Sequence, residues 1–254
     1  MIENASDLTL DELRVALAPA IADSAIFDGW TETALLAAAE MEGVDPALAR
    51  LAFKAQGRQS AAMAMVAAWI AWIDVSMARD LPQEALADRK IREKIRDLVL
   101  YRLNAVEGQE EAMRRALAIG AMPQNVRASL RGAWNSADLM WRLAGDTATD
   151  YNHYTKRAIL SSLYSATLLV WVDDQSEDKE ETRAFLDRRI ENVMQFEKTK
   201  AQLLGGADRE SFREFTPQNS PYTLVDLILS SAGINQLCPH ITLHELLVSP
   251  PYST

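Results

Sequence analysis

The sequence predicts an all-α protein, and three observations support this prediction. No run among the 254 residues shows the strict polar–apolar alternation of a half-buried strand. None of the nine prolines lies between residues 124 and 216, so long helices can continue there without a break. In several other stretches apolar residues recur every three or four positions, which is the spacing of an amphipathic helix. A chain of this length can bury a sizeable core.

Capping and breaking residues place the helices in order. The first is expected over residues 9–26, with a kink at Pro19. Thr31 can cap the second helix, which runs to residue 41, and Pro46 opens a third that runs to residue 54. The same reasoning gives six further helices, over residues 60–79, 83–106, 107–119, 124–143, 150–172 and 177–204.

Three short helices followed by longer ones are the layout of a TetR-like helical bundle, with segments 31–42 and 45–54 in the place of its helix-turn-helix. Residues 1–56 carry ten acids and three bases, a net charge of −7, which repels the phosphates that a DNA-binding element must contact. We therefore predict a degenerate helix-turn-helix-like segment and no nucleic-acid partner. The predicted division is residues 1–56, a ligand-binding domain over 57–216, and a Pro-containing tail over 217–254.

Motifs for catalysis are absent from the sequence. It contains no glycine-rich phosphate loop and no nucleophile elbow. His240 and His244 would share one face of a helix with Glu245 and could form half of a metal site, but Pro239 argues against a helix there. We expect no catalytic residue, no metal and no cofactor. A helical enzyme that uses these histidines is one interpretation of the chain. The other two, a lipid-binding accessory protein and a transcriptional regulator, are described below.

The compartment is predicted from cysteine usage and the first residues. Cys238 is the single cysteine, which fits a reducing compartment. Residues 1–10 lack the basic and apolar segments of a signal peptide and the arginines of a transit peptide. We predict a bacterial cytoplasmic protein, or an already processed form, with peripheral contact at the inner membrane.

Residues 61–73 are apolar around almost the whole circumference of their predicted helix. Small alanines leave room and methionines adapt to irregular apolar shapes, so this helix could wall a lipid tunnel. A helix that is apolar on all sides is also typical of a buried core. Helix faces give the candidate lipid-binding residues, which are Met65, Trp69, Trp72, Tyr101 and Leu163.

The most distinctive stretch is a predicted helical hairpin over residues 138–158. Gly145 stops its first helix, and Thr149 or Asp150 can cap its second. Aromatic side chains ringed by charge suit a protein interface, although the same aromatics could staple the hairpin while the acids cap it. The candidate partner-binding residues are Asp138, Met140, Trp141, Asp146, Asp150, Tyr151 and Tyr154.

Residues 141–158 read W-R-L-A-G-D-T-A-T-D-Y-N-H-Y-T-K-R-A and fit the pattern W-x-x-A-G-D-x-x-T-D-[FY]-N-x-Y-T-[KR]-R-A. This run resembles the Coq-nine family of ubiquinone-biosynthesis accessory proteins. Residues 28–31, 163–164 and 182–190 also look like the family, so the resemblance covers about residues 9–216.

The resemblance implies a TetR-like fold that has lost DNA binding, and a non-catalytic, dimeric protein. It implies that isoprenoid lipids or ubiquinone precursors bind in a hydrophobic pocket, and that the protein docks on the di-iron demethoxyubiquinone hydroxylase through Asp138, Trp141 and their surroundings. The alternative function is a TetR-type transcriptional regulator that senses a hydrophobic ligand. The tail departs from the family, because residues 218–254 contain no Lys or Arg to meet anionic headgroups.

Overall fold

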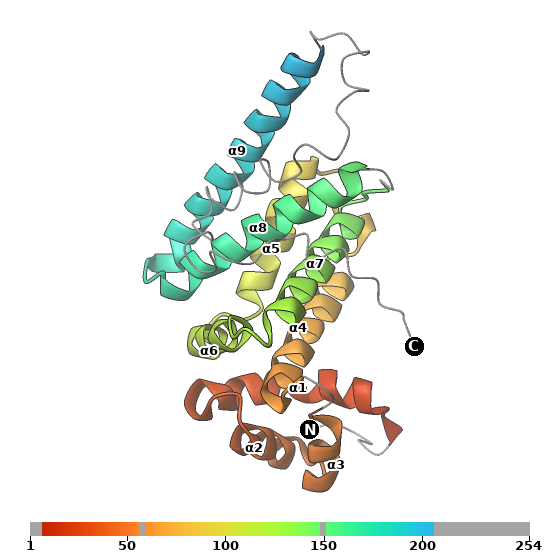
Figure 1. Cartoon of the computed structure of the whole chain (residues 1–254), viewed down its shortest axis with the longest axis vertical. Helices are drawn as coiled ribbons and strands as arrows, with labels where there is room; N and C mark the ends of the chain where they lie inside the picture. The colour runs from red at the N-terminus through yellow and green to blue at the C-terminus, as the bar shows by residue number, and fades with distance from the viewer. Residues whose placement is uncertain (1–6, 56–58, 148–150, 206–254) are drawn as a thin grey trace.

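The computed structural model describes residues 7–55, 59–147 and 151–205, and within these ranges every regular element is helical (Figure 1). The prediction of an all-α fold is confirmed; its TetR-like arrangement and the predicted division into domains stay predictions. The α-helices are α1 Leu10–Asp28, α2 Glu32–Glu42, α3 Pro46–Ala52, α4 Ala61–Asp80, α5 Ile91–Asn104, α6 Glu110–Gly120, α7 Val126–Leu143, α8 Tyr151–Asp173 and α9 Glu180–Gly205. Two short 3₁₀ helices, η2 Gln83–Leu86 and η3 Glu177–Lys179, precede α5 and α9.

Helices α1, α2 and α3 pack together at the lower end of the molecule in Figure 1. The side chains of Thr9, Thr31 and Asp45 cap their first turns. Helix α1 continues through Pro19. On α3, the guanidinium of Arg50 is paired with Glu32 at 2.6 Å, so one of the few cations in this region already has an acidic partner.

Helix α4 connects the lower helices to the rest of the bundle, because it packs against α1, α5, α6 and α7. Its Trp69 is fully buried, with its ring centroid 5.2 Å from that of Trp30. Among the described helices, α4 is long and apolar enough to cross a membrane by length and composition, and 44% of that stretch is buried inside the protein. The apolar side chains of α4 therefore belong at least in part to the hydrophobic core.

A buried ion pair ties the middle of the bundle together. Arg102 of α5 is 1% exposed and donates to the carboxylate of Asp74 on α4. Ser136 of α7 donates to the same carboxylate at 3.1 Å, and the ring of Tyr164 on α8 lies 4.9 Å from the Arg102 guanidinium carbon. Four helices thus meet at one polar cluster, whose charges are paired inside the protein.

One predicted helix is wrong in its extent. Residues 83–106 form η2 and then α5, rather than a single helix. The chain between them holds backbone hydrogen bonds of turns, such as Arg89 N–H to Leu86 O at 3.1 Å. This break brings the start of α5 beside the end of α7, where Lys94 Nζ donates to Ala144 O at 3.3 Å.

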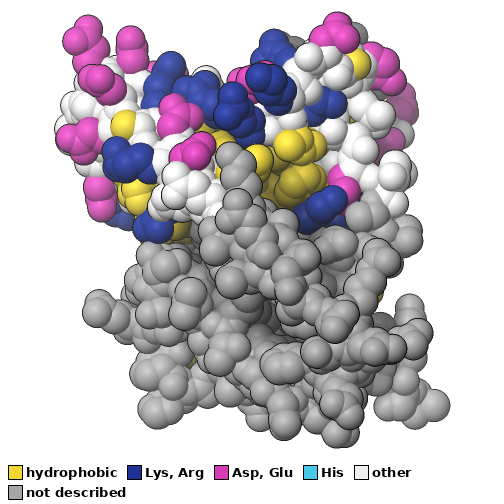
Figure 2. Space-filling view, turned by 90° about the horizontal axis from the view of Figure 1, so that it is seen from above, with side chains coloured by type: hydrophobic (Ala, Val, Ile, Leu, Met, Phe, Trp, Pro, Cys, Tyr) yellow, Lys and Arg dark blue, Asp and Glu magenta, His cyan; other side chains and the backbone are white. Residues whose placement is uncertain are grey.

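The negative charge of the chain is unevenly spread over its surface. Seen from above in Figure 2, Lys and Arg side chains gather beside hydrophobic side chains near the middle of the described face, while Asp and Glu side chains stand mostly toward its outer edges. An overall net charge of −10 therefore coexists with locally basic surface.

Asp174 organises the connection from α8 to α9. Its buried carboxylate accepts hydrogen bonds from the backbone and hydroxyl of Ser176 at 2.9 and 2.5 Å, and from the backbone and hydroxyl of Thr182 at 2.8 and 2.5 Å. Burial of the carboxyl opposes its ionisation, but these hydrogen bonds prevail and lower the pKa of Asp174 to about 2. The ionised form therefore stabilises the folded state.

We predict that Asp174→Asn lowers the melting temperature at pH 7, because the amide cannot accept four donors; the loss expected is about 1–2 kcal/mol. Because the folded pKa lies below the ordinary value, the stabilisation is present above about pH 4 and is lost as the pH falls toward 2. The gap between wild type and variant, followed by circular dichroism, should narrow over that range. Asp173→Asn is the control, since that side chain is 79% exposed. Equal melting temperatures for wild type and Asp174→Asn at pH 7 would contradict this role.

Candidate functional site

The turn between α7 and α8 is set by Gly145. Its φ of +90° lies in the left-handed region that glycine adopts without strain, so α7 can end and the chain can reverse there. The backbone N–H groups of Gly145 and Asp146 donate to Arg142 O and Trp141 O, both at 2.9 Å. The turn therefore directs Asp146 back toward the start of α8.

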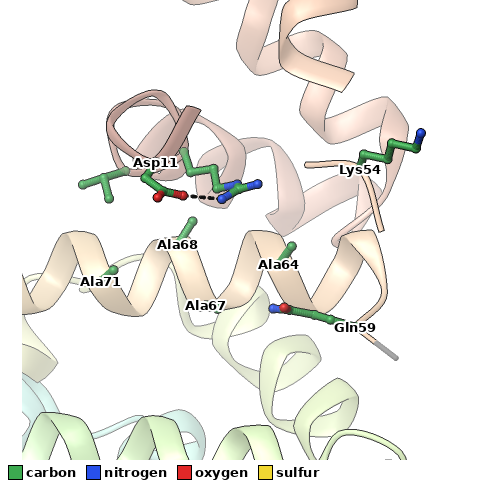
Figure 3. Close-up of a pocket in the computed structure, with 9 residues that line it drawn as sticks. Asp11, Lys54, Gln59, Ala64, Ala67, Ala68 and Ala71 are labelled. Carbon is green, nitrogen blue, oxygen red and sulfur yellow. Dashed lines mark hydrogen bonds and ion pairs between the residues drawn. The ribbon is translucent and has the colours of Figure 1, made fainter. Parts of the chain in front are cut away.

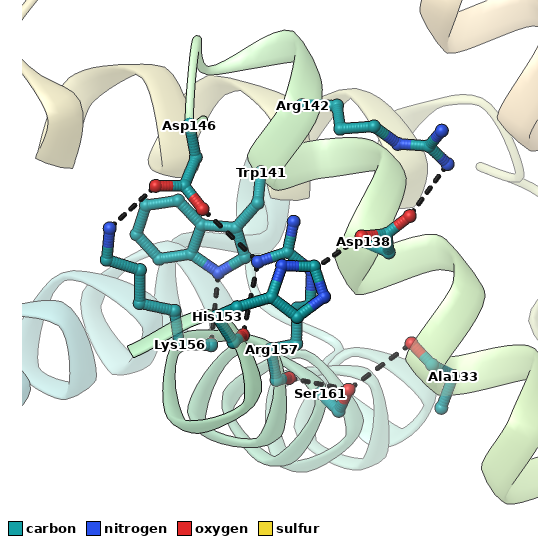
Figure 4. A network of polar contacts seen from close by, with 9 residues as sticks. All are labelled: Ala133, Asp138, Trp141, Arg142, Asp146, His153, Lys156, Arg157 and Ser161. Carbon is teal, nitrogen blue, oxygen red and sulfur yellow. Dashed lines mark hydrogen bonds and ion pairs between the residues drawn. The ribbon is translucent and has the colours of Figure 1, made fainter. Parts of the chain in front are cut away.

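The guanidinium of Arg157 on α8 lies at the centre of the hairpin (Figure 4). Its side chain is 2% exposed. Its Nε donates to Asp138 of α7 at 2.5 Å, and its Nη1 donates to Asp146 of the turn at 3.2 Å and to His153 O at 3.1 Å. One buried cation thus joins α7, the turn and α8.

Lys156 and Trp141 add a second set of contacts across the same turn. Lys156 Nζ lies 2.6 Å from Asp146 and 5.3 Å from the centre of the Trp141 ring. The Trp141 indole N–H donates to the backbone oxygen of Lys156 at 3.0 Å. The Lys156 ammonium therefore makes both an ion pair with Asp146 and a cation–π contact with Trp141.

These contacts favour the stapling interpretation for much of the motif. Asp138, Asp146 and the indole N–H of Trp141 all make hydrogen bonds inside the hairpin. A buried charge is tolerated when it is paired, and removal of its partner is costly. The residues that give the motif its distinctive sequence hold α7 and α8 in one fixed relation.

The outward face of α7 carries a continuous row of large and charged side chains. The buried residues of this helix are Ser136, Ala137 and Met140. At 100° per residue, the side chains opposite them follow helical spacing along about 22 Å of helix. We call this row the α7 stripe; it consists of Arg127, Leu130, Arg131, Trp134, Asp138, Trp141 and Arg142.

Tyr154 of α8 extends the α7 stripe sideways. Its side chain is 62% exposed, and its ring centroid lies 6.2 Å from that of Trp134. A partly exposed tryptophan and an exposed tyrosine beside arginines are the composition of an interaction hot spot. The arrangement can bind a protein surface, with Trp134 and Tyr154 as its aromatic centre.

The predicted partner-binding residues fall into three groups. Tyr154 is at the surface, whereas Asp138, Trp141 and Asp146 are partly exposed and engaged in the hairpin. The prediction for Met140 is corrected: its side chain is fully buried in the core and does not reach a partner. Asp150 and the side chain of Tyr151 lie outside the described residues, as do His240 and His244 of the tail.

The predicted lipid-binding residues occupy the core and its edge. Met65, Trp69 and Leu163 are buried in the main hydrophobic cluster, and Trp72 and Tyr101 pack against it with partial exposure. The Tyr101 hydroxyl donates to Asp80 at 2.6 Å, and burial together with that acceptor raises the pKa of Tyr101 to about 12. The structure therefore places all five residues in or against one hydrophobic core.

Within the described residues, a pocket of about 260 Å³ lies between α1 and α4. None of the five predicted lipid-binding residues lines it. Figure 3 shows its alanine floor, with Lys54 and Gln59 at the rim. The Arg14–Asp11 ion pair closes one side. The lining residues are Asp11, Arg14, Val15, Lys54, Gln59, Ala64, Ala67, Ala68 and Ala71.

Comparison with known proteins places the hairpin in a family. Residues 126–197 match the COQ9 family model, and this segment begins with the first residue of α7. The ubiquinone biosynthesis protein COQ9 of Rattus norvegicus is 33% identical over 182 residues, which is 69% of this chain and 56% of the relative. The chain belongs to the COQ9 family. The human COQ9 protein is 32% identical over 182 residues, 69% of this chain and 55% of that protein.

The fission yeast coq9 protein, from Schizosaccharomyces pombe, is 32% identical over 100 residues, which is 39% of this chain and 40% of that protein. The chain spans just over half the length of the rat and human COQ9 proteins. Family membership, which residues 141–158 predict, is confirmed by these matches.

The predicted location is wrong. The rat, human, bovine and fission yeast relatives are all named as mitochondrial proteins, which points to the mitochondrion and contradicts a bacterial cytoplasmic location. The prediction relied on the composition of residues 1–10 and on the single cysteine. Neither property distinguishes a bacterial chain from a mitochondrial relative.

Sequence reasoning missed the residue at the centre of the hairpin and most of the α7 stripe. Arg157 belongs to the motif, but the sequence alone assigns it no role, because its two carboxylate partners stand 19 and 11 residues away. The signal for the stripe was available: Arg127, Arg131 and Trp134 follow i, i+4, i+7 spacing opposite the apolar face of α7.

We predict that Arg157→Met lowers the free energy of unfolding by about 3 kcal/mol, because it removes the buried cation shared by Asp138 and Asp146 and leaves them only their more exposed partners. Arg142→Met is the matched control: it removes an ion pair to the same Asp138, but the Arg142 side chain is 63% exposed, so about 0–1 kcal/mol is expected. Urea denaturation followed by circular dichroism measures both. Equal losses in the two variants would show that Arg157 does not hold the hairpin.

Proposed function

We propose that this chain is a non-catalytic accessory protein of ubiquinone biosynthesis. It binds an isoprenoid lipid or ubiquinone precursor and presents it to the demethoxyubiquinone hydroxylase. The observation that carries the proposal is the coincidence of the α7 stripe with the segment that matches the COQ9 family model, residues 126–197. The names of the relatives supply the pathway.

Docking on the hydroxylase is supported by the two different faces of α7. One face of the helix packs in the core, and the hairpin network holds α7 rigidly against α8. The opposite face leaves Trp134 partly exposed, and Tyr154 of α8 is exposed beside it. A rigid scaffold with accessible aromatics needs little ordering on association, which favours binding.

Lipid binding is supported by the apolar character of α4 and by the resemblance to the family. Trp72 and Tyr101, which are partly exposed, would meet a ligand first. Met65, Trp69 and Leu163 would contact it only after it enters the bundle, since all three are buried. A homodimer and a peripheral membrane contact are further parts of the proposal that the resemblance supplies.

Two observations argue against the alternative, a transcriptional regulator. The first 56 residues carry a net charge of −7. Of their three bases, Arg14 and Arg50 are engaged with Asp11 and Glu32. Little positive charge is left on α1–α3 to meet a DNA backbone.

We predict that the purified chain co-elutes with the hydroxylase on gel filtration, and that organic extraction of the peak yields a quinone or isoprenoid precursor by mass spectrometry. Folding is verified by circular dichroism before extraction. An empty extract from folded protein would remove the lipid half of the proposal. Separate elution of the two proteins would remove the docking half.

A further inference from the structure

The α7 stripe is positively charged although the chain is acidic. It contains three arginines and one carboxylate, in a protein of net charge −10. The carboxylate, Asp138, is shared between Arg157 at 2.5 Å and Arg142 at 2.7 Å. The stripe therefore has no carboxylate left over for its other arginines.

Arg127 and Arg131 are the two cations of the stripe that remain. Both side chains are exposed, and neither makes a hydrogen bond or an ion pair within the described residues. They stand four residues apart, so their guanidinium groups rise from the same face of α7 about 6 Å from each other along the axis. Two adjacent guanidinium groups match two carboxylates well, because each can donate a bidentate pair.

Apolar surface lies directly beside these cations. Leu130 is 44% exposed and stands between Arg127 and Arg131 in the sequence, and Trp134 follows one turn later beside Tyr154. Arginine with exposed aromatic and aliphatic side chains is the composition found at the centre of protein interfaces. A nucleic acid would need a larger basic footprint, and the acidic remainder of the chain repels phosphates.

We propose that the α7 stripe docks an acidic protein surface, in which partner carboxylates pair with Arg127 and Arg131 while an apolar side chain packs on Leu130 and Trp134. This inference rests on the proposed docking function and adds the chemistry of the partner's contact surface. Complementary charge accelerates encounter and selects the partner, so the association rate falls as salt screens the pair.

The test is the association rate of the full chain with the hydroxylase, measured by stopped flow at low and at physiological salt. The double variant Arg127→Glu/Arg131→Glu should associate at least about tenfold more slowly at low salt, and its salt dependence should shrink or reverse. Arg183→Glu/Arg188→Glu on α9 is the matched control, since it makes the same charge change at two exposed arginines outside the stripe. Circular dichroism verifies that all three proteins are folded.

Equal association rates for the two double variants would overturn the inference while leaving hydroxylase docking in place. Failure of the wild-type chain to bind the hydroxylase would overturn both. The same three proteins are also mixed with a DNA duplex and with vesicles of anionic phospholipid. Binding to either that Arg127→Glu/Arg131→Glu abolishes and the control variant retains would overturn the assignment to an acidic protein surface.

Discussion

The buried guanidinium of Arg157 is the interaction on which the functional surface depends. It joins Asp138 of α7, Asp146 of the turn and the backbone of α8 with an exposure of only 2%. A charge in such a place is stable only while its partners remain, so the three elements are held in one arrangement. The direction in which α7 presents its outer face follows from that constraint.

The family motif acquires a physical explanation from this geometry. Gly145 permits the reversal, Asp146 returns a carboxylate to α8, and Trp141 closes the turn through its indole N–H and its contact with Lys156. The residues best suited to meet another protein are Tyr154, which belongs to the motif, and residues of α7 that precede the motif. Tyr154 is exposed beside the partly exposed Trp134, and Arg127 and Arg131 extend the same surface.

Much of the fold could be predicted from periodicity and capping, because helix ends depend on local interactions. Thr31, Pro46 and Gly145 mark real boundaries. The predicted helix over residues 83–106 was wrong because the segment between η2 and α5 contains no proline or glycine, the residues that usually mark a helix end in a sequence. Helical spacing could also have excluded Met140 from the surface, since it points about 100° away from Trp141 into the core.

The candidate site was harder to predict, because its contacts join residues that only the folded chain brings together. Arg157 meets Asp138 and Asp146 across a turn, and the stripe becomes visible only once the core face of α7 is known. The location was predicted from cysteine usage and from residues 1–10, which do not identify a compartment, and the relatives named as mitochondrial corrected it. Residue types alone identified the hairpin. Its geometry distinguishes the residues that join α7 to α8 from those whose side chains can contact another protein.

The most direct measurement is hydroxyl-radical footprinting of the full chain with and without the hydroxylase, read by mass spectrometry at individual side chains. Buried Trp69 and Trp171 serve as internal references, and exposed Phe27 reports on the distant end of α1. Protection of Trp134 and Tyr154 on complex formation, with Phe27 unchanged, is the predicted result. Unchanged oxidation of Trp134 and Tyr154 in a complex that forms would show that the hydroxylase binds elsewhere.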